Sequence, residues 1–247
     1  MASYGPLCTL FYDADKPAAP EAEVAWYAQH LPKDAGVLLE LMCGSGRLLV
    51  PLAAQGFKLH GVDSSAAMLA SCEARVAAHG IEAPLFRQDL TQLNLPFRYA
   101  AAFVAVGSFQ LITEPGAALL ALERIRAHLV EPGLLLLDMF VPAESELRLG
   151  APLVEVRTAR LDDGSQIALR SESTVWADAR MVRTEYRYAH RRGATRLAEE
   201  HESISLTWYT PDEISALLAE AGYRDVTTGA SPQVSSDGRV FSVTARV

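Results

Sequence analysis

Residues 37–140 alternate between short apolar runs and amphipathic segments, and this alternation restricts the fold more than any other feature of the chain. Helical spacing of apolar residues predicts helices over 65–79 and 116–130. Strands that alternate with helices build a parallel sheet through right-handed crossovers. The last run before residue 110 is apolar on both faces, which is typical of a central strand. The five runs that predict strands are 37–39, 58–62, 83–87, 100–106 and 134–140.

A different pattern follows Pro142. Four β stretches separated by turn sequences predict an antiparallel insertion over residues 151–208. A capping box at 210–213 then begins a helix that ends at Gly222, and two final strands are expected near 223–228 and 239–246. We therefore expect one α/β domain over residues 1–247. The four stretches of the insertion are 153–160, 166–176, 180–190 and 197–207.

The N-terminal residues 1–19 predict an arm that closes over the rest of the domain. Its aromatic residues, among them Tyr4 and Tyr12, make it too apolar for a free tail, and Gly5-Pro6 and Pro17 are expected to break regular structure. We expect the arm to act as a lid on the ligand-binding end of the sheet. The alternative is that its aromatic side chains pack on the back of a helix predicted over 21–31.

Composition excludes several classes of protein. The chain has 22 Lys+Arg and 30 Asp+Glu, a formal net charge of −8, which argues against a nucleic-acid or anionic membrane surface. Three sparse cysteines form neither a disulfide framework nor a zinc site, and no cluster of metal ligands is present in the sequence. No signal peptide or apolar run of about 20 residues is visible. The expectation is a reduced, cytoplasmic protein without a metal.

Four motifs follow the predicted strands in order. The segment 40–47, ELMCGSGR, places an acidic residue and Gly-x-Gly between a strand and a helix, where a ligand can approach the backbone closely. A dinucleotide site would need a third glycine at Leu49. Asp63 can accept both hydroxyls of a ribose, as an acidic residue does about 20 positions after such a turn. Asp89-Leu90 suits an adenine ring, and 106–110 lies where a doubly wound sheet binds ligands.

These motifs, LLELMCGSGR, GVDSSAAML, RQDL and AVGSFQLI, resemble the class I S-adenosylmethionine-dependent methyltransferases over roughly residues 37–140. The resemblance implies a Rossmann-like sheet of seven strands, parallel with one reversed edge strand, plus the antiparallel β insertion on the substrate side. The insertion before the WYTPDEI helix resembles small-molecule N-methyltransferases of the glycine and amino-sugar kind. The implied cofactor is S-adenosyl-L-methionine, and the implied partner is a small molecule bound by a monomer or homodimer.

The resemblance also implies roles for individual residues. Glu40 and the glycine backbone would hold the methionine part of the cofactor. The family has glycine where this chain has Met42, which is compatible with the family if φ of Met42 stays negative. The implied cofactor-binding residues are Tyr12, Glu40, Met42, Gly44, Gly46, Asp63, Ser64, Met68, Asp89, Leu90 and Val106, and the candidates for catalysis are Tyr4, Tyr12, Ser108 and Gln110.

The inferred reaction is methyl transfer from a sulfonium to a small nucleophile. An amine acceptor is favoured, because a neutral amine needs little acid–base help and no His–Asp pair or metal cluster is evident in the sequence. The alternatives are O- or C-methylation of a small metabolite and a non-catalytic cofactor-binding module of the same fold.

Overall fold

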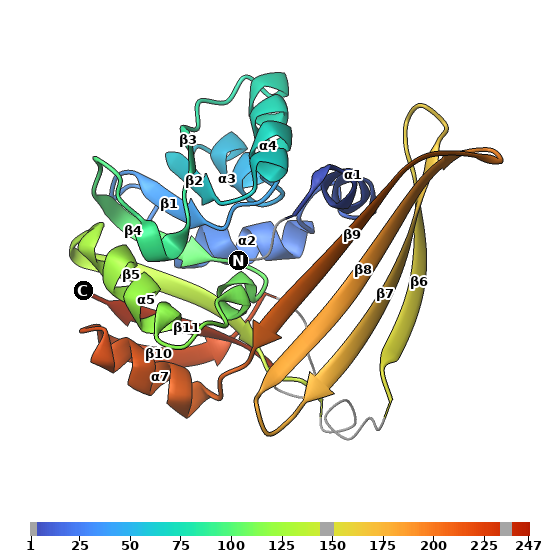
Figure 1. Ribbon diagram of the computed structural model, residues 1–247. Helices are drawn as coiled ribbons and strands as arrows, with labels where there is room; N and C mark the ends of the chain where they lie inside the picture. The colour runs from blue at the N-terminus through green and yellow to red at the C-terminus, as the bar shows by residue number, and fades with distance from the viewer. Residues whose placement is uncertain (1–3, 144–150, 233–238) are drawn as a thin grey trace.

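Two β-sheets organise the computed structural model, which describes residues 4–143, 151–232 and 239–247 (Figure 1). The larger sheet has seven strands in the order β10-β11-β5-β4-β1-β2-β3. Strand β11 runs antiparallel to both of its neighbours, and the pairs among β1 to β5 are parallel. The seven strands are β1 (Leu38–Leu41), β2 (Leu59–Asp63), β3 (Leu85–Arg87), β4 (Tyr99–Val104), β5 (Leu129–Phe140), β10 (Arg224–Ala230) and β11 (Val240–Arg246). The predicted fold class is confirmed, and the reversed strand is the inner member of the edge pair.

Helices cover both faces of this sheet, and its central strands β1 and β4 are buried at every residue. Successive side chains of a strand point to opposite faces, so Leu38 belongs to the core under α2, α3 and α4, and Leu39 to the core under α5 and α7. Both leucines are fully buried. The helices are α2 (Glu21–His30), α3 (Leu49–Ala54), α4 (Ala66–Ala78), α5 (Ala117–Ala127) and α7 (Pro211–Glu220), with short 3₁₀ turns η1 (Leu90–Gln92) and η2 (Ser108–Leu111). The predicted capping box is present at the start of α7.

The insertion is a separate antiparallel sheet that stands beside the larger one (Figure 1). Its turns contain the glycines that the sequence pattern indicates, with φ of 79° at Gly164 and 57° at Gly193. The order follows the chain, so that β6 and β9 are the two edges. The four strands are β6 (Leu153–Arg160), β7 (Gln166–Trp176), β8 (Met181–Arg192) and β9 (Thr195–Thr207).

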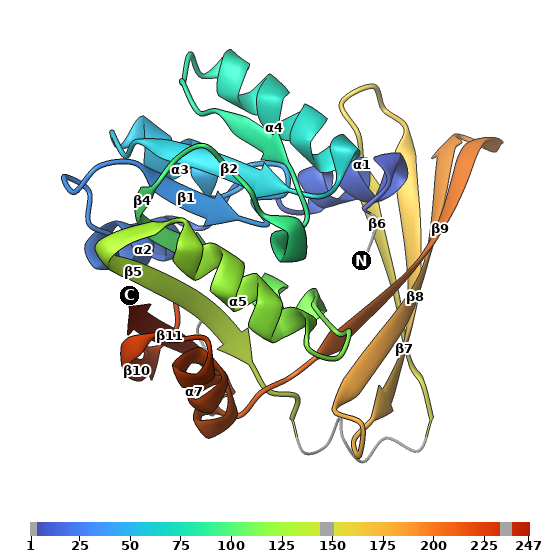
Figure 2. The same ribbon diagram turned by 60° about the vertical axis from the view of Figure 1, so that its left-hand side comes forward.

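The N-terminal arm differs from its prediction, because α1 (Pro6–Asp15) is a regular helix. Pro6 occupies the first helical turn, where a missing N–H breaks no hydrogen bond, so Gly5-Pro6 begins the helix and does not interrupt it. The apolar face of α1 does not pack on the back of α2 either. Phe11 lies in a cluster with Ile167 and Tyr188 of the insertion, and α1 is placed between that sheet and α4 (Figures 1 and 2). Residues 1–3 of the predicted arm lie outside the described residues.

Within the ranges described, no helix has the length and apolar character that crossing a bilayer requires.

Candidate functional site

A cavity of about 230 Å³ lies at the carboxyl ends of β1, β2, β3 and β4, under α1. This is the edge at which open α/β sheets bind ligands. The arm, the glycine turn and the residues that follow each strand all contribute to it. Its described lining consists of Tyr4, Tyr12, Lys16, Glu40, Met42, Cys43, Gly44, Arg47, Leu48, Asp63, Ser64, Met68, Gln88, Leu90, Ala105, Val106, Ser108 and Leu111. The predicted cofactor-binding residues therefore lie together around one cavity, with the exception of Gly46 and Asp89.

The glycine turn after β1 uses a left-handed backbone at three alternate positions. Gly44 and Gly46 have φ of 55° and 79°, which suits glycine. Met42 also has φ of 55°, so the negative φ on which its fit to the family pattern was conditioned is not observed. A left-handed non-glycine residue stores strain of about 1–3 kcal/mol, and such residues cluster at functional sites. A Cβ on Gly46 would approach Sγ of Cys72 to 2.6 Å, so Gly46 serves close packing on α4 and not the cavity wall.

Two buried polar atoms of the turn lack a partner among the described residues. They are Oε2 of Glu40, in a side chain that reaches the cavity, and Oγ of Ser45. Burial raises the pKa of Glu40 well above its ordinary value, because desolvation disfavours the charged carboxylate. A buried polar atom without a partner costs free energy, and a ligand that donates a hydrogen bond or brings a cation would recover it. Oε2 of Glu40 is thus a buried acceptor to which a ligand could donate a hydrogen bond.

Asp63 ends β2 and ties the glycine turn to the next helix. Its Oδ2 accepts from the Gly44 amide at 2.9 Å and its Oδ1 accepts from the Ser65 amide at 2.8 Å. Burial raises its pKa, and these amide hydrogen bonds oppose the rise. The cap of α4 is Ser65, whose hydroxyl accepts from the Met68 amide at 3.2 Å. Both Asp63 and Ser64 border the cavity.

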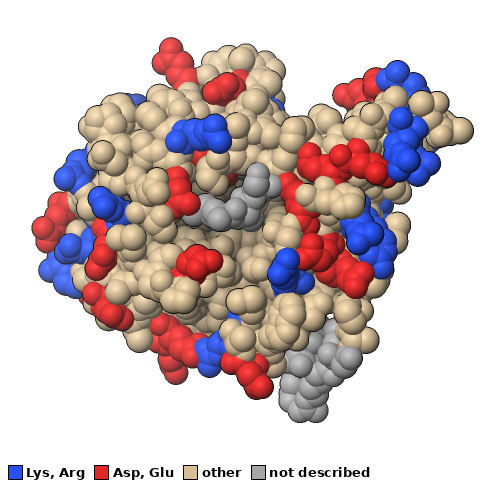
Figure 3. All heavy atoms as spheres, in the orientation of Figure 1, with Lys and Arg blue, Asp and Glu red and all other residues tan. Residues whose placement is uncertain are grey.

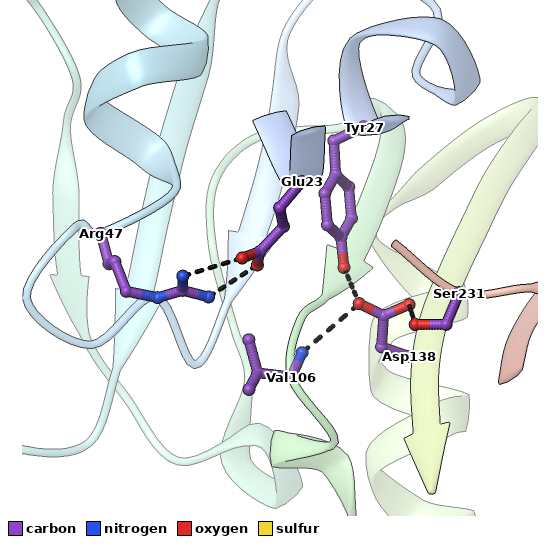
Figure 4. Close-up of polar contacts among 6 residues, drawn as sticks. All are labelled: Glu23, Tyr27, Arg47, Val106, Asp138 and Ser231. Atoms are coloured by element: carbon purple, nitrogen blue, oxygen red, sulfur yellow. Dashed lines mark hydrogen bonds and ion pairs between the residues drawn. The ribbon is translucent and has the colours of Figure 1, made fainter. Parts of the chain in front are cut away.

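Two cations at the cavity were missed by the sequence reasoning. Arg47 forms a bidentate pair with Glu23 of α2, at 2.8 and 2.6 Å, and both side chains are buried (Figure 4). Lys16 lies with its Nζ 5.7 Å from the centre of the Tyr12 ring, and burial lowers its pKa. Arg47 directly follows the Gly-x-Gly segment, which was the available signal. The signal for Lys16 was weaker, since it required knowing where the arm lies.

The remaining predicted residues divide between the cavity and its surroundings. Leu90, Val106 and Ser108 line the cavity. Oδ1 of Asp89 accepts from the Thr91 amide at 2.8 Å and caps η1, and the residue borders a neighbouring cavity of about 700 Å³.

Gln110 is fully buried, and its amide group is occupied by the backbone. Its Nε2 donates to the carbonyls of Phe140 and Thr207, each at 2.9 Å, and its Oε1 accepts from the Phe140 amide at 2.9 Å. Gln110 therefore joins the end of β5 to the end of β9 and is not part of the described cavity lining.

Known proteins resemble the part of the chain that builds this cavity. A family model described as a methyltransferase domain matches residues 38–133. This match spans less than half of the chain and indicates a methyltransferase domain over these residues. A protein named as a methyltransferase in Geobacillus sp. (strain WCH70) is 33% identical over 102 residues, 41% of each chain. The cypemycin N-terminal methyltransferase of Streptomyces sp is 27% identical over 199 residues, 81% of this chain and 77% of that protein. The first of these relatives is thus matched over less than half of its length.

Solved structures share the whole fold. An S-adenosylmethionine-dependent methyltransferase from Clostridium acetobutylicum ATCC 824 aligns with a TM-score of 0.77 at 18% identity, over 96% of both chains. An amino pentose methyltransferase from Micromonospora echinaspora, solved with S-adenosylmethionine bound, aligns with a TM-score of 0.69 at 24% identity, over 96% of this chain and 94% of that one. These structures confirm the predicted fold class, and the family match supports a methyltransferase domain within that fold.

Proposed function

We propose that this chain transfers the methyl group of S-adenosylmethionine to an amine nitrogen of a small molecule. The observation that carries the proposal is the unpartnered, buried oxygen of Glu40 in a cavity at the ends of parallel strands. The amino group and sulfonium of the cofactor are cationic and would satisfy that oxygen. The residues present therefore fit the cofactor.

Each part of the cofactor has a chemical counterpart in the cavity lining. Glu40 and the Gly44 backbone would hold the amino end of the methionine part, and Arg47 and Lys16 would bind its carboxylate as cations do. Asp63 would accept the ribose hydroxyls through lone pairs that the Gly44 and Ser65 amides leave free.

The adenine ring would lie between apolar side chains at the other end of the cavity. Leu90 and Val106 would pack on the ring, and Ser64 and Met68 would border it and the ribose. Asp89 would accept a hydrogen bond from the exocyclic amine of adenine through Oδ2, since Oδ1 already accepts from the Thr91 amide and caps η1. Gly46 would not touch the cofactor; its left-handed backbone and close packing on Cys72 would keep the glycine turn in place.

When bound, the cofactor supplies an electrophilic methyl group on its sulfonium. The chain has to orient the acceptor and exclude water around that group. Burial raises the pKa of Tyr4 and Tyr12, so both phenols stay neutral, and among the described lining residues only Glu40 and Asp63, which would face the cofactor, carry a carboxyl group. A hydroxyl acceptor would need a general base and a neutral amine would not, which favours an amine.

The relatives and the net charge support the same acceptor class. The relative that aligns over 81% of this chain is named as an N-terminal methyltransferase, and a sugar N-methyltransferase from Streptoalloteichus sp shares the fold with a TM-score of 0.71. A net charge of −8 attracts cationic amines and repels nucleic acids. We retain a monomer or homodimer as the expected assembly, which light scattering after gel filtration would measure.

The helix α1 would act as the lid of this site. Its amides on Leu7 and Cys8 donate to the Glu200 carboxylate of β9, at 3.0 and 2.9 Å. Its other end is held on α4, where Asp13 pairs with Arg75 at 2.7 Å. Tyr4 and Tyr12 extend from this segment to the cavity, so a closed α1 would exclude water from the reacting groups.

Calorimetry tests the cofactor assignment directly. We expect binding of S-adenosylmethionine and S-adenosylhomocysteine and none of NAD. Asp63→Ala should lower the affinity about tenfold to a hundredfold, since charge-assisted hydrogen bonds contribute about 1.5–3 kcal/mol. Asp163→Ala, which removes an exposed turn aspartate of the insertion, is the matched control and should leave affinity unchanged. Binding of NAD alone would contradict the assignment.

Transfer of a labelled methyl group tests the acceptor. Amino sugars and peptides with free N-terminal amines should accept label from the cofactor, and their hydroxyl or acetylated counterparts should not. Label on the hydroxyl counterparts alone would replace the amine proposal with O-methylation.

A further inference from the structure

A buried tyrosine–aspartate pair lies behind the cavity wall and is not explained by the proposed roles. Tyr27 of α2 donates a short hydrogen bond to Oδ2 of Asp138, near the end of β5 (Figure 4). Both side chains are fully buried, and neither is among the described residues that line the cavity. Burying a carboxylate in an apolar core costs free energy of desolvation unless hydrogen-bond donors offset it. The stability of Asp138 in this position therefore depends on its donors.

Those partners come from three segments of the chain. Besides Tyr27, Oδ2 accepts from the Val106 amide in a long hydrogen bond of 3.5 Å, and Oδ1 accepts from the Ser231 hydroxyl at 3.3 Å. Val106 follows β4 and Ser231 follows β10. The carboxylate thus joins α2, the segment after β4 and the segment after β10 (Figure 4).

Val106 is the strained member of this group. Its φ is 58°, a left-handed conformation that a β-branched residue rarely adopts. Its side chain lines the cavity, and its amide is turned toward Asp138. The next residue, Gly107, has φ of 68°, and a Cβ there would approach the Phe140 ring to 2.7 Å. The segment after β4 is therefore pressed against the end of β5, and its strained residue faces the ligand site.

The same face of α2 also contacts a second residue of the cavity lining, Arg47. Glu23 lies four residues before Tyr27, one helical turn away, and pairs with Arg47 of the cavity lining. Figure 4 shows the Glu23–Arg47 and Tyr27–Asp138 contacts side by side, and both Arg47 and Val106 line the cavity. One helix face thus braces the wall after the glycine turn and the wall after β4.

We infer that Tyr27 and Asp138 are positioning residues of the cofactor pocket, which hold Val106 in its strained conformation against the bound cofactor. The inference rests on the proposed function, since it assigns Val106 to the wall of the S-adenosylmethionine site. Without the pair, Val106 would relax toward negative φ and its side chain would leave the wall. Cofactor affinity would then fall although no residue that touches the cofactor had changed.

The first test compares conservative variants by calorimetry with S-adenosylhomocysteine. Tyr27→Phe and Asp138→Asn should each weaken binding about fivefold or more, since the strain of one residue corresponds to at least about a fivefold change in affinity. Tyr223→Phe is the matched control, because it removes another buried hydroxyl, which donates to the Leu122 carbonyl at 3.0 Å away from the cavity. It should lower the unfolding temperature and leave affinity unchanged. Wild-type affinity in both test variants would overturn the inference.

The second test asks whether the pair acts through Val106. Glycine adopts a left-handed φ without strain, so a Val106→Gly background needs no support at this position. Tyr27→Phe should therefore weaken binding in the wild-type background and have no effect in the Val106→Gly background. Equal losses in both backgrounds would show that the pair does not act through Val106. If the wild type binds no S-adenosylhomocysteine, the proposed function fails before these variants are compared.

A pH profile gives a third readout. Burial raises the pKa of Asp138 to about 6, a rise that Tyr27, the Val106 amide and the Ser231 hydroxyl oppose and Glu23 increases. On β11, its neighbour in register is the uncharged Ser242. Below this pKa the carboxyl is neutral and a weaker acceptor for the Val106 amide.

The diagnostic quantity is the ratio of the affinities of wild type and Asp138→Asn, because Glu40 and Asp63 titrate in both proteins. That ratio should shrink as the pH is lowered from about 7.5 to about 5, through the raised pKa of Asp138 and above the ordinary range of carboxyl groups. A ratio that is constant over this range would contradict a role for the charged carboxylate.

Discussion

The two sheets of this protein differ in what keeps them folded. The seven-stranded sheet is buried on both faces between helices, with two large apolar clusters. The insertion has one small cluster, to which α1 contributes Leu7, Cys8 and Phe11. Large apolar side chains remain exposed elsewhere on the insertion, for example Val156 at 69%. The larger sheet contains its own core, whereas the insertion depends on α1 for the cover of its inner face.

Charge is used differently in the two regions as well. Near the cavity, Glu23 and Arg47 form an ion pair whose side chains are only 8% and 10% exposed. On the insertion, acidic and basic side chains alternate over the surface of β8 and β9, and pairs such as Arg196–Glu199 lie in solvent at 58% and 46% exposure (Figure 3). The buried Glu23–Arg47 pair holds a residue of the cavity lining in place, whereas the exposed Arg196–Glu199 pair lies on the solvated surface of the insertion.

Deletion of residues 1–14 should have the largest effect that this comparison predicts. It removes Tyr4 and Tyr12 from the cavity and uncovers the apolar face of the insertion. Methyl transfer should be abolished, while cooperative unfolding of the seven-stranded sheet persists. Labelled-methyl assays and urea unfolding followed by circular dichroism would measure the two outcomes. Turnover at the full rate in the truncated protein would disprove the lid.

A ligand experiment separates a lid from a permanent strap. If α1 opens and closes, protease cleavage within residues 6–15 should slow when cofactor and acceptor bind. If α1 is a strap, protection should be complete without ligand, and the difference between the two states should vanish.

Breaking the buried ion pair should have the next largest effect. Arg47→Leu leaves the Glu23 carboxylate buried without its cation, which costs about 3–5 kcal/mol of unfolding free energy. The double variant Glu23→Leu, Arg47→Leu removes both charges and should be more stable than the single variant, since neither charge is then left unpaired. Urea unfolding measures both. A double variant less stable than Arg47→Leu would show that the unpaired Glu23 carboxylate is not what destabilises the single variant.

The same comparison explains what could be predicted from the sequence. The central strands of the larger sheet are buried on both faces, so their apolar runs were visible, and the motifs at the strand ends gave much of the cavity lining. The strands of the insertion were equally visible, because turn sequences such as Asp162-Asp163-Gly164 separate them. Local sequence determines these features directly.

Features that depend on tertiary contacts could not be predicted. The helix α1 has ten residues, too short to be stable alone, and forms because it packs on the insertion and α4. The positive φ of Met42 and Val106 follows from loop geometry that no local pattern specifies. Tyr27 and Asp138 are 111 residues apart, and Asp138 stands in the apolar run LLLLDMF, where nothing marks it as half of a pair.

The smallest effect is expected for an exposed ion pair of the insertion. Arg196→Gln keeps most of the side-chain stem and removes the charge that pairs with Glu199. Exposed ion pairs add little to the free energy of unfolding, because water and salt screen the charges and ordering two long side chains costs entropy. The urea midpoint of the variant should match that of the wild type within error, at low and at high salt.

The pH dependence of the same variant completes the contrast with the buried pair. A hydrogen bond from Arg196 and its charge hold the pKa of Glu199 below its ordinary value. A depressed acid pKa contributes stability that is present above the unfolded pKa and is lost as the pH falls through the folded one. Since this carboxylate is exposed, screening reduces that contribution, and the difference between Arg196→Gln and wild type should stay near zero from about pH 7 to about pH 4. A variant whose deficit is large at neutral pH and disappears on acidification would mean that the surface charges of the insertion, and not only its contact with α1, hold this sheet together.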